Sequence, residues 1–375
     1  SSGIKIRGIA SMYASTNPLV IVDGAPYPGN LSSIPSDDIE SVTVLKDAAS
    51  AALYGARGAA GVIIVTTKSG KNRDAEITVD AKWGANSRAV QDYDVITDPA
   101  EYYEAVYAAT YNKSYYGDGL SASAANLAAN NTMLKGLAYN IYTLPEGQQL
   151  IGMDGKINPA ATLGRIFEKD GEKYYLTGDD WNKAAYKTAL RQEYNISAKG
   201  SYDRGSFYAS AGYLNDEGII DNSSYERISA RIKADYQAKR WLKLGVNAQY
   251  VHSDTKSSPN LDEKMGSTNI MYFASRIAPI YPIYIRKVGD DGKPYIATDK
   301  YGHQRYDYGL PAGYGMTRPF MSTGNPLGSN QYNTNDLGVN QINGTFIADI
   351  SFTDWLKLNI TSNVNYNTAE SSIYT

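Results

Sequence analysis

The fold of the first part of the chain is decided by one stretch, Pro18 to Lys68, which reads PLVIVDGAPYPGNLSSIPSDDIESVTVLKDAASAALYGARGAAGVIIVTTK. Runs of apolar and β-branched residues predict short strands at Leu19–Val22, Val42–Leu45 and Val62–Thr66. Between the second and third runs, Asp47–Tyr54 is rich in alanine, which favours a helical segment. The stretch therefore predicts a small mixed α/β unit.

Three glycines, Gly55, Gly58 and Gly61, precede the third predicted strand with the spacing GxxGxxG. A nucleotide-binding loop has the spacing GxGxxG or a following Lys-Ser/Thr pair, and it leads from a strand into a helix. Here the order is helix, loop, strand. We interpret the glycines as tight turns of the backbone, and Asp23-Gly24 as the turn that ends the first strand.

The overall composition excludes several classes of function. The 375 residues carry a formal net charge of −3 and include no cysteine. A near-neutral chain lacks the positive field that attracts nucleic acid, so no nucleic-acid partner is expected. Disulfides, thiolate metal sites and catalytic thiols are excluded. The two histidines, His252 and His303, are interpreted as plain strand or loop residues, so no metal or cofactor is implied.

Tyrosine is strongly over-represented, with 33 tyrosines against 6 phenylalanines. Its apolar ring and polar tip suit surfaces that are partly apolar and partly wet, such as membrane interfaces, barrel walls and sugar-binding clefts. A secreted β-sheet protein would also use tyrosine as a good strand former. Composition leaves these alternatives open.

The ends of the chain look unlike natural termini. No run of about 18 apolar residues occurs, so no transmembrane helix is predicted. The opening residues, SSGIKIRGIA, lack the hydrophobic stretch of a signal peptide. Because strand-like sequence lies close to both ends, we expect the chain to be an internal piece of a longer protein.

A polar connector, Lys71–Asp74, marks the predicted domain boundary. Residues 1–72 form the first domain and residues 73–375 the second. The second domain begins with an alternating segment, Glu76–Trp83, that predicts a half-buried strand.

Three helices are predicted before the alternation resumes. The first begins at Asp98 as N-cap with Pro99 following, and the others cover Ser121–Leu134 and Asp179–Leu190. The apolar face of the first helix is predicted to contain Tyr102, Ala105, Val106 and Ala109. We interpret these helices as packing against a neighbouring wall rather than as binding a partner.

From Gln192 onward, apolar and polar residues alternate through strands of about ten residues, and short turns alternate with longer connections. This pattern is typical of transmembrane β-barrels, and about seven or eight strands are expected after residue 74. The predicted lipid-facing positions include Ile228, Ile232, Leu242 and Leu244. The predicted lumen-facing positions include Arg231, Lys233 and Asp235.

An internal repeat supports the barrel interpretation. Ala234-Asp235 followed by Trp241-Leu242-Lys243-Leu244 recurs as Ala348-Asp349 followed by Trp355-Leu356-Lys357-Leu358. Each tryptophan stands at the foot of a predicted hairpin, where an aromatic girdle anchors a barrel in lipid headgroups. Trp241 and Trp355 are therefore membrane-girdle candidates, although a soluble sheet could also place tryptophan there.

Two long connections, about 84–190 and 252–340, are predicted to be extracellular loops. Asp290-Asp291-Gly292 in the second is interpreted as a hairpin turn, because it lacks the ligand spacing of a calcium loop. Tyrosines of this loop could stack on a sugar or peptide substrate, and ordinary loop packing explains them equally well. These substrate-binding candidates are Tyr295, Tyr301, Tyr306, Tyr308 and Tyr314.

Several of these segments together resemble a known family. PLVIVDGAPY (Pro18–Tyr27), DIESVTVLKDAASAALYGARGAAGVIIVTTKSG (Asp38–Gly70) and YLNDEGII (Tyr213–Ile220) are similar to the SusC-like (SusC/RagA) branch of TonB-dependent outer-membrane transporters. Tyr225-Glu226-Arg227 paired with Trp241-Leu242-Lys243-Leu244 resembles it too. The residues that match the family's plug signature are Pro18, Asp23, Gly24, Glu40, Leu45, Lys46, Asp47, Tyr54, Gly55, Gly58 and Gly61.

The resemblance implies that the first domain is the later part of a plug and the second is the first part of a barrel of about 22 strands. It implies active import of an oligosaccharide or peptide across the bacterial outer membrane, with no enzymatic step. It also implies a SusD-like surface lipoprotein as a lid, outer-membrane lipid around the wall, and TonB as the energy source, reached through an N-terminal segment that this sequence lacks.

Two other classes remain as alternatives. A secreted or surface-attached soluble β-protein could bind glycans through its tyrosine-rich loops. A glycosidase would need two carboxylates at a set separation, and no local motif proposes such a pair.

Overall fold

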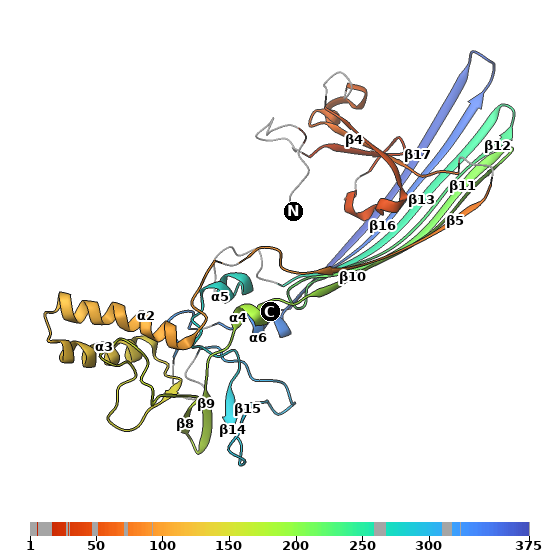
Figure 1. The fold of residues 1–375 in the computed structure, drawn as a ribbon. Coiled ribbons are helices and arrows are strands. Elements are labelled where there is room, and N and C mark those ends of the chain that lie inside the picture. Colours follow the sequence, from red (N-terminus) through yellow and green to blue (C-terminus); the bar gives the residue numbers. More distant parts are fainter. Residues whose placement is uncertain are drawn as a thin grey trace.

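The computed structural model describes residues 6, 17–27, 29, 31–46, 52–70, 74–91, 93–258, 268–309, 317–322 and 324–374. Three parts are distinguished in the ribbon (Figure 1): a small domain near the N-terminus, a long sheet, and a loop domain at one end of that sheet. We call the first the plug and the second the wall.

The plug is built on a mixed four-stranded sheet in the order β2-β1-β4-β3. Its strands are β1 (Leu19–Val22), β2 (Ala25–Pro26), β3 (Ile39–Leu45) and β4 (Val62–Thr67), and β1 runs parallel to β4. The three apolar runs predicted as strands are confirmed. Their side chains form the plug core, in which Ile21, Val62 and Val65 are almost fully buried.

Short helical turns connect the plug strands: η1 (Leu31–Ser33), η2 (Ser36–Asp38) and η3 (Ala52–Gly58). The alanine-rich segment is only partly described, because residues 47–51, including Asp47, lie outside the described residues. Its described part is a 3-10 segment broken at Gly55, where φ is 60°. Gly61 has φ 100°, so the interpretation of these two glycines as turn residues is confirmed.

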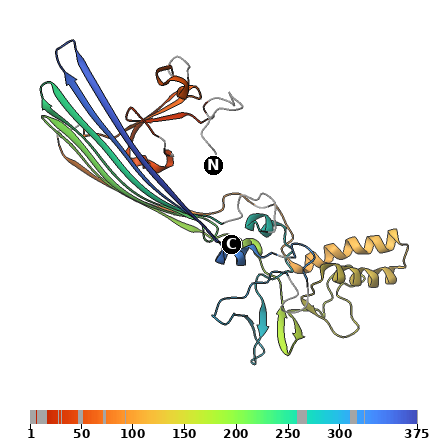
Figure 2. The ribbon, with the colours of Figure 1, turned by 180° about the vertical axis from the view of Figure 1, so that it is seen from behind.

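The wall is a seven-stranded antiparallel sheet in the order β17-β16-β13-β12-β11-β10-β5 (Figures 1 and 2). Its strands are β5 (Glu76–Asn86), β10 (Ala189–Tyr202), β11 (Gly205–Glu217), β12 (Ser224–Lys239), β13 (Leu242–Lys256), β16 (Thr334–Ser351) and β17 (Lys357–Tyr374). The expected number of strands is confirmed. The connection after β11 covers only residues 218–223, because the strand continues through Asn215 to Glu217. Within the described residues the sheet is open, with β5 and β17 at its edges.

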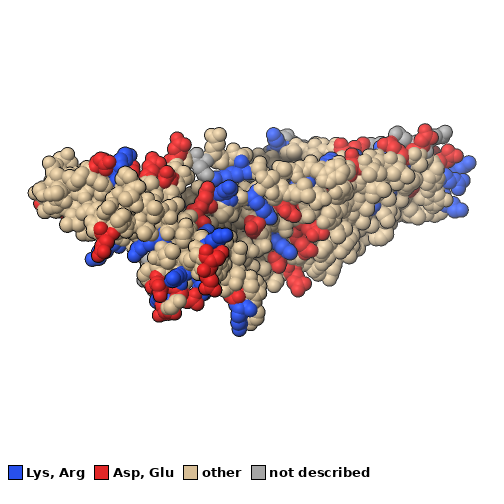
Figure 3. All heavy atoms as spheres, turned by 60° about the horizontal axis from the view of Figure 1, so that its bottom comes forward, with Lys and Arg blue, Asp and Glu red and all other residues tan. Residues whose placement is uncertain are grey.

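The two faces of the wall differ as the alternating sequence requires. On the outer face, Ile228, Ile232 and Leu244 are exposed by 47%, 58% and 43%. On the plug-facing face, Arg231 is only 2% exposed. Figure 3 shows the sheet region at the right as a surface with few charged side chains across its middle, and Lys and Arg gathered at its far tip.

The two long connections fold together into the loop domain. The first contributes α2 (Pro99–Asn112), η4 (Lys113–Gly117), α3 (Ala122–Leu137), β6 (Tyr142–Thr143), β7 (Thr162–Leu163), β8 (Arg165–Lys169), β9 (Glu172–Leu176) and α4 (Trp181–Ala185). The second contributes α5 (Ile270–Arg276), β14 (Arg286–Val288), β15 (Pro294–Ile296) and α6 (Pro326–Tyr332). The sheet β15-β14-β9-β8 takes strands from both connections, and one core joins Tyr103 and Leu176 to Ile280 and Tyr281.

The helix predictions were partly correct. Asp98 caps α2 by accepting from the Ala100 N–H, and Ser121 caps α3. The third helix is short, because Ala189 already begins β10. The predicted apolar face of α2 was half correct. Tyr102 and Val106 pack against the loop-domain core, whereas Ala105 and Ala109 are exposed.

The buried face of α2 is carried by Tyr103 and Tyr107, which are 0% and 4% exposed. The tyrosine hydroxyls are satisfied inside the loop domain: Tyr103 donates to the Tyr139 carbonyl, and the Tyr107 hydroxyl accepts from Asn126 of α3. The expectation that these helices pack against the wall was therefore wrong; they pack against each other and the loop-domain core. Within the described residues, no helix combines the length and apolar character needed to cross a bilayer.

Candidate functional site: the plug–wall interface

One plug carboxylate is the centre of the contact with the wall. Asp23 accepts from the Thr67 N–H at 3.0 Å and the Thr67 hydroxyl at 2.5 Å within the plug. From the wall it accepts from Arg231 at 2.7 Å, Lys233 at 3.0 Å and Asn247 at 2.8 Å. We call these five residues the latch cluster. Together they fasten the plug to β12 and β13.

The local sequence explains why Asp23 projects from the plug. Asp23 and Gly24 form the turn between β1 and β2 with φ values of 48° and 85°. An Asp-Gly pair suits a two-residue hairpin turn, in which both central residues need positive φ. The same turn that ends the first strand thus carries the carboxylate towards the wall.

The latch cluster is electrostatically strong because little water reaches it. The side chains of Arg231 and Asp23 are 2% and 9% exposed. Burial alone would raise the pKa of Asp23, but the hydrogen bonds from Thr67 and the charges of Lys233 and Arg231 together hold that pKa below its ordinary value. Asp23 is therefore ionised at neutral pH, and its contribution to plug seating is lost only as the pH falls through that lowered pKa.

Two further carboxylates of the plug, Asp37 and Asp38, contact the wall at strands β5, β10 and β11. Asp38 accepts from the Tyr208 hydroxyl of β11 at 2.6 Å, and Asp37 accepts from Asn195 of β10 at 2.5 Å. Lys82 of β5 pairs with Asp37 at 2.9 Å. The plug therefore presents carboxylates at two places, and cationic, hydroxyl and amide groups of the wall donate hydrogen bonds to them.

The connector between the two domains is also closely fitted. A Cβ added to Gly70 would stand 2.1 Å from the Gly200 carbonyl oxygen and 2.4 Å from that of Phe207. Only glycine leaves room for the chain to pass against β10 and β11 here.

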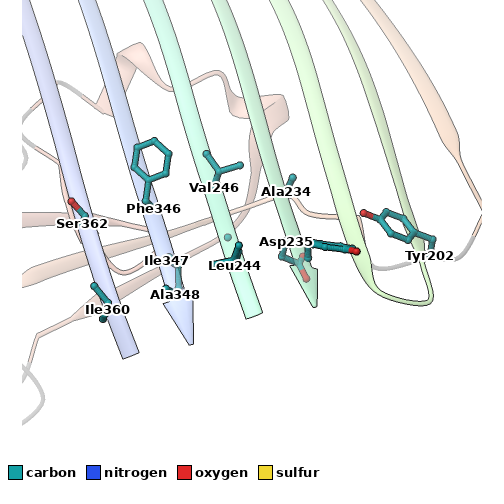
Figure 4. Close-up of a pocket in the computed structure, with 12 residues that line it drawn as sticks. Tyr202, Ala234, Asp235, Leu244, Val246, Phe346, Ile347, Ala348, Ile360 and Ser362 are labelled. Carbon is teal, nitrogen blue, oxygen red and sulfur yellow. The ribbon is translucent and has the colours of Figure 1, made fainter. Parts of the chain in front are cut away.

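The outer face carries a separate apolar groove of about 400 Å³ (Figure 4). Its lining comes from four neighbouring strands, β12, β13, β16 and β17, with Tyr202 at the end of β10. Leu244, Phe346 and Ile360 make most of its wall, and Ala234 and Ala348 leave the space between them. The groove is on the opposite side of the sheet from the latch cluster.

The structure brings together some of the predicted site residues. Among the predicted lumen-facing positions, Arg231 and Lys233 contact the plug, whereas Asp235 bonds along the wall to Ser206 and pairs with Lys243. Thr67 and Asn247 were missed. The only sequence signal of Asn247 was its position on the polar side of an alternating strand, and Thr67, at the end of the apolar run of β4, had no such signal.

The remaining plug-signature residues that the structure describes lie within the plug. Leu45 and Tyr54 pack beside Ile21 and Val62, and Gly58 accepts from the Gly61 N–H. Glu40 is exposed on β3, and Pro18 and Lys46 flank β1 and β3.

The girdle candidates Trp241 and Trp355 are 53% and 83% exposed. Both lie in short connections at the end of the wall opposite the loop domain. Sequence reasoning missed a second aromatic group near the loop-domain end, where Trp83 donates to the Tyr194 hydroxyl at 2.9 Å. Their contact with lipid stays a prediction.

The candidate tyrosines of the second connection do not form one cluster. Tyr295 and Tyr301 are exposed by 51% and 72%, whereas Tyr306 packs on Tyr284 with ring centroids 5.0 Å apart. Tyr308 is partly buried, and Tyr314 lies outside the described residues.

The other polar candidates are also placed. The interpretation of Asp290-Asp291-Gly292 as a hairpin turn is confirmed by the bond from the Gly289 N–H to the Lys293 carbonyl. His252 contacts Asn340 and Asp254, and His303 contacts Asp299. No group of three or more potential metal ligands occurs in the described part of the chain.

Comparisons with known proteins agree with this architecture. Residues 1–62 match the family model "TonB-dependent Receptor Plug Domain". The chain is 27% identical over 262 residues to the TonB-dependent receptor SusC of Bacteroides thetaiotaomicron, covering 68% of this chain and 20% of that protein. It is 24% identical over 359 residues to the TonB-dependent receptor P26 of Formosa agariphila, covering 94% of this chain and 28% of that protein.

Among solved structures, the RagAB peptide importer in its open-open state matches with a TM-score of 0.66 and 22% identity, covering 99% of this chain and 36% of that chain. Its closed-closed state matches with a TM-score of 0.64. The chain thus spans only a fifth to about a quarter of the length of these curated relatives, 20% and 28%.

The first domain matches the plug of the TonB-dependent receptors, and in the structure it contacts one face of an antiparallel wall. The plug match, the similarity to SusC and the fold shared with RagAB point to one branch of these receptors. The chain is similar to the SusC-like (SusC/RagA) TonB-dependent receptors.

Proposed function

We propose that this chain serves as the plug and part of the wall of an importer that takes up an oligosaccharide or peptide across the outer membrane, driven by TonB. The observation that carries the proposal is the latch cluster. Three wall donors, from Arg231, Lys233 and Asn247, hold the Asp23 carboxylate of the plug, yet each of these contacts is non-covalent and can be broken by a pull on the plug.

The outer face supports a membrane location. Ile77, Val79 and Ile232 are exposed by 72%, 71% and 58%, and soluble monomers rarely expose a contiguous apolar surface of this kind. Exposed aromatic residues at both ends, Trp83 and Trp355, fit the two girdles of an outer-membrane barrel. The same surface disfavours the soluble glycan-binding alternative.

We further propose that the loop domain contacts the substrate or a SusD-like lipoprotein. Its position at the end of the wall away from the short turns is the extracellular side in such barrels. The RagAB structures are described as those of a peptide importer. The family resemblance of the sequence implies an oligosaccharide or a peptide as cargo.

The test is a deletion of the full-length gene, followed by growth and uptake assays on a panel of glycans and peptides. The proposal is supported if the deletion strain loses growth on one class of nutrient and the wild-type gene restores that growth. The same gene should fail to restore growth in a deletion strain that also lacks TonB. Normal uptake of every nutrient by the deletion strain, together with recovery of the full-length protein from the soluble fraction without detergent, contradicts it.

A further inference from the structure

A small cavity of about 20 Å³ lies between the plug and the wall, next to the latch cluster. The plug side of the cavity is the hairpin Val22–Tyr27, and the wall side includes Arg231, Gln249, Asn343 and Asn365. This volume accommodates one species about the size of a water molecule.

Three buried nitrogen atoms in the lining have no acceptor within the described structure. They are Nε and Nη1 of Arg231 and Nε2 of Gln249. Nδ2 of Asn343 has only the Tyr27 hydroxyl beside it. Arg231 and Gln249 are 2% and 5% exposed, so bulk water does not reach them. A buried donor without an acceptor is unfavourable, and more so when it is charged. Several such donors at one place therefore indicate a bound acceptor.

The strand register explains why these donors meet. Arg231 of β12 lies opposite Gln249 of β13, which lies opposite Asn343 of β16, which lies opposite Asn365 of β17. Directly opposite residues on one face have Cβ atoms about 4.5–5.5 Å apart. The row therefore places its donors side by side beneath the plug hairpin.

The chemistry of the row favours an anion over water. Water accepts two hydrogen bonds and must donate two of its own, whereas the unmet groups here are all donors. Arg231 is a donor in every rotamer, and it is the only charged residue among the described residues that line the cavity. The Asp23 contact occupies its Nη2 atom and leaves Nε and Nη1 free to bind.

We propose that this cavity binds one small monovalent anion of the size of chloride, held by Arg231, Gln249 and Asn343 and covered by the plug hairpin. Larger oxyanions do not fit the volume. Because the lining comes from both plug and wall, displacement of the plug opens the site and releases the anion. The inference rests on the geometry of the interface and holds whatever the cargo is.

The test uses the full-length receptor crystallised with bromide in place of chloride. A bromide anomalous peak within hydrogen-bonding distance of Arg231 Nε and Nη1 is expected. A peak with no anomalous signal, which would be water, or no peak at all overturns the proposal.

Thermal unfolding of the full-length receptor gives a second measurement. Replacing gluconate by chloride at constant ionic strength is expected to raise the Tm of the wild type saturably, and to leave that of Gln249→Leu unchanged. Asn367→Leu is the matched control, because Asn367 is the next plug-facing position of β17 after Asn365 and does not line the cavity. It should keep the chloride effect. An equal chloride response in the wild type and Gln249→Leu also overturns the proposal.

Discussion

Asp23 shows how much a single side chain can decide in this molecule. Its carboxylate serves the plug through Thr67 and the wall through Arg231, Lys233 and Asn247. The wall residues stand more than 200 positions later in the sequence, at separations of 208, 210 and 224. Asp23 is one of several residues that match the plug signature, and in the structure its carboxylate joins the plug to the wall.

Replacement of Asp23 by asparagine should loosen the plug. The shape of the turn is retained, but Arg231 and Lys233 lose their counter-charge at a buried site, and removing one partner of a buried pair costs about 3–5 kcal/mol. Hydrogen exchange of the full-length receptor should show faster exchange in β1 and β4. Asp74→Asn, an exposed carboxylate of the connector, is the control and should leave both strands protected. Unchanged exchange in Asp23→Asn would mean that the latch cluster does not hold the plug.

Asp307 makes the stability of the loop domain depend on pH. It is 5% exposed, and burial raises its pKa to about 6, although the Gly309 N–H and Arg318 oppose that shift. At pH values between the ordinary carboxyl pKa and about 6, Asp307 therefore keeps a proton in the folded state, whereas in the unfolded state it has lost that proton. The loop domain should be more stable at pH 5 than at pH 7.5.

Thermal unfolding of the full-length receptor at the two pH values measures this effect. Asp307→Asn should reduce the difference between them and should not destabilise the protein at pH 7.5, since a neutral side chain avoids the cost of a buried charge. Asp290→Asn, in an exposed turn, should keep the wild-type difference. If the wild type is less stable at pH 5, the assignment to Asp307 is wrong.

At the scale of single elements, strand alternation makes each wall strand two-sided. Neighbouring positions of β12 have opposite environments: Ile232 is 58% exposed on the outer face, and Arg231 is 2% exposed against the plug. The period-two pattern required this, because successive side chains of a strand point to opposite faces. The alternation of apolar and polar residues also runs through β13 and β17, although β17, at an edge of the described sheet, is exposed along its whole length.

The two neighbours should respond differently to substitution. Ile232→Arg places a charge on the outer face, which we propose faces lipid. Near the bilayer midplane it should cost about 2–4 kcal/mol and so lower the amount of folded receptor in outer-membrane fractions. Arg231→Ile should assemble better than Ile232→Arg, but its plug should exchange faster. Heat-modifiable gel mobility reports assembly, and the opposite ranking of the two variants would reverse the assignment of the faces.

The helices of the loop domain were harder to place than the strands. Caps at Asp98 and Ser121 are local signals and were found, whereas the buried face of α2 depends on what it meets. Tyr103 and Tyr107 are buried because Tyr139 and Asn126 satisfy their hydroxyl groups. Such partners come from other segments, so periodicity alone selected alanines that prove exposed.

At the scale of the whole molecule, the two long connections form one unit. The Tyr281 hydroxyl donates to the Leu137 carbonyl, and Arg286 makes a two-point contact with Asp179, so each connection satisfies groups of the other. Apolar burial joins them further, with Ile280 of the second connection in a core made mostly by the first.

Truncation of Ile280 should therefore loosen both connections together. Ile280 is 0% exposed, and Ile280→Ala should cost about 2–5 kcal/mol. Limited proteolysis of the full-length receptor should then cut in both connections at lower protease concentration. Ile166→Ala, at a position 52% exposed, should leave the cleavage pattern unchanged. Cleavage confined to the second connection would show that the two do not fold as one unit.

Local sequence determined the plug strands, the turns at Asp23-Gly24 and Gly61, the helix caps and the two faces of the wall, because each depends on residues a few positions apart. The plug–wall contacts, the shared core of the loop domain and the donor row at Arg231, Gln249 and Asn343 were decided only by the tertiary structure. These features join residues that are distant along the chain. Their partners are set by strand register and domain packing, which a single sequence does not display.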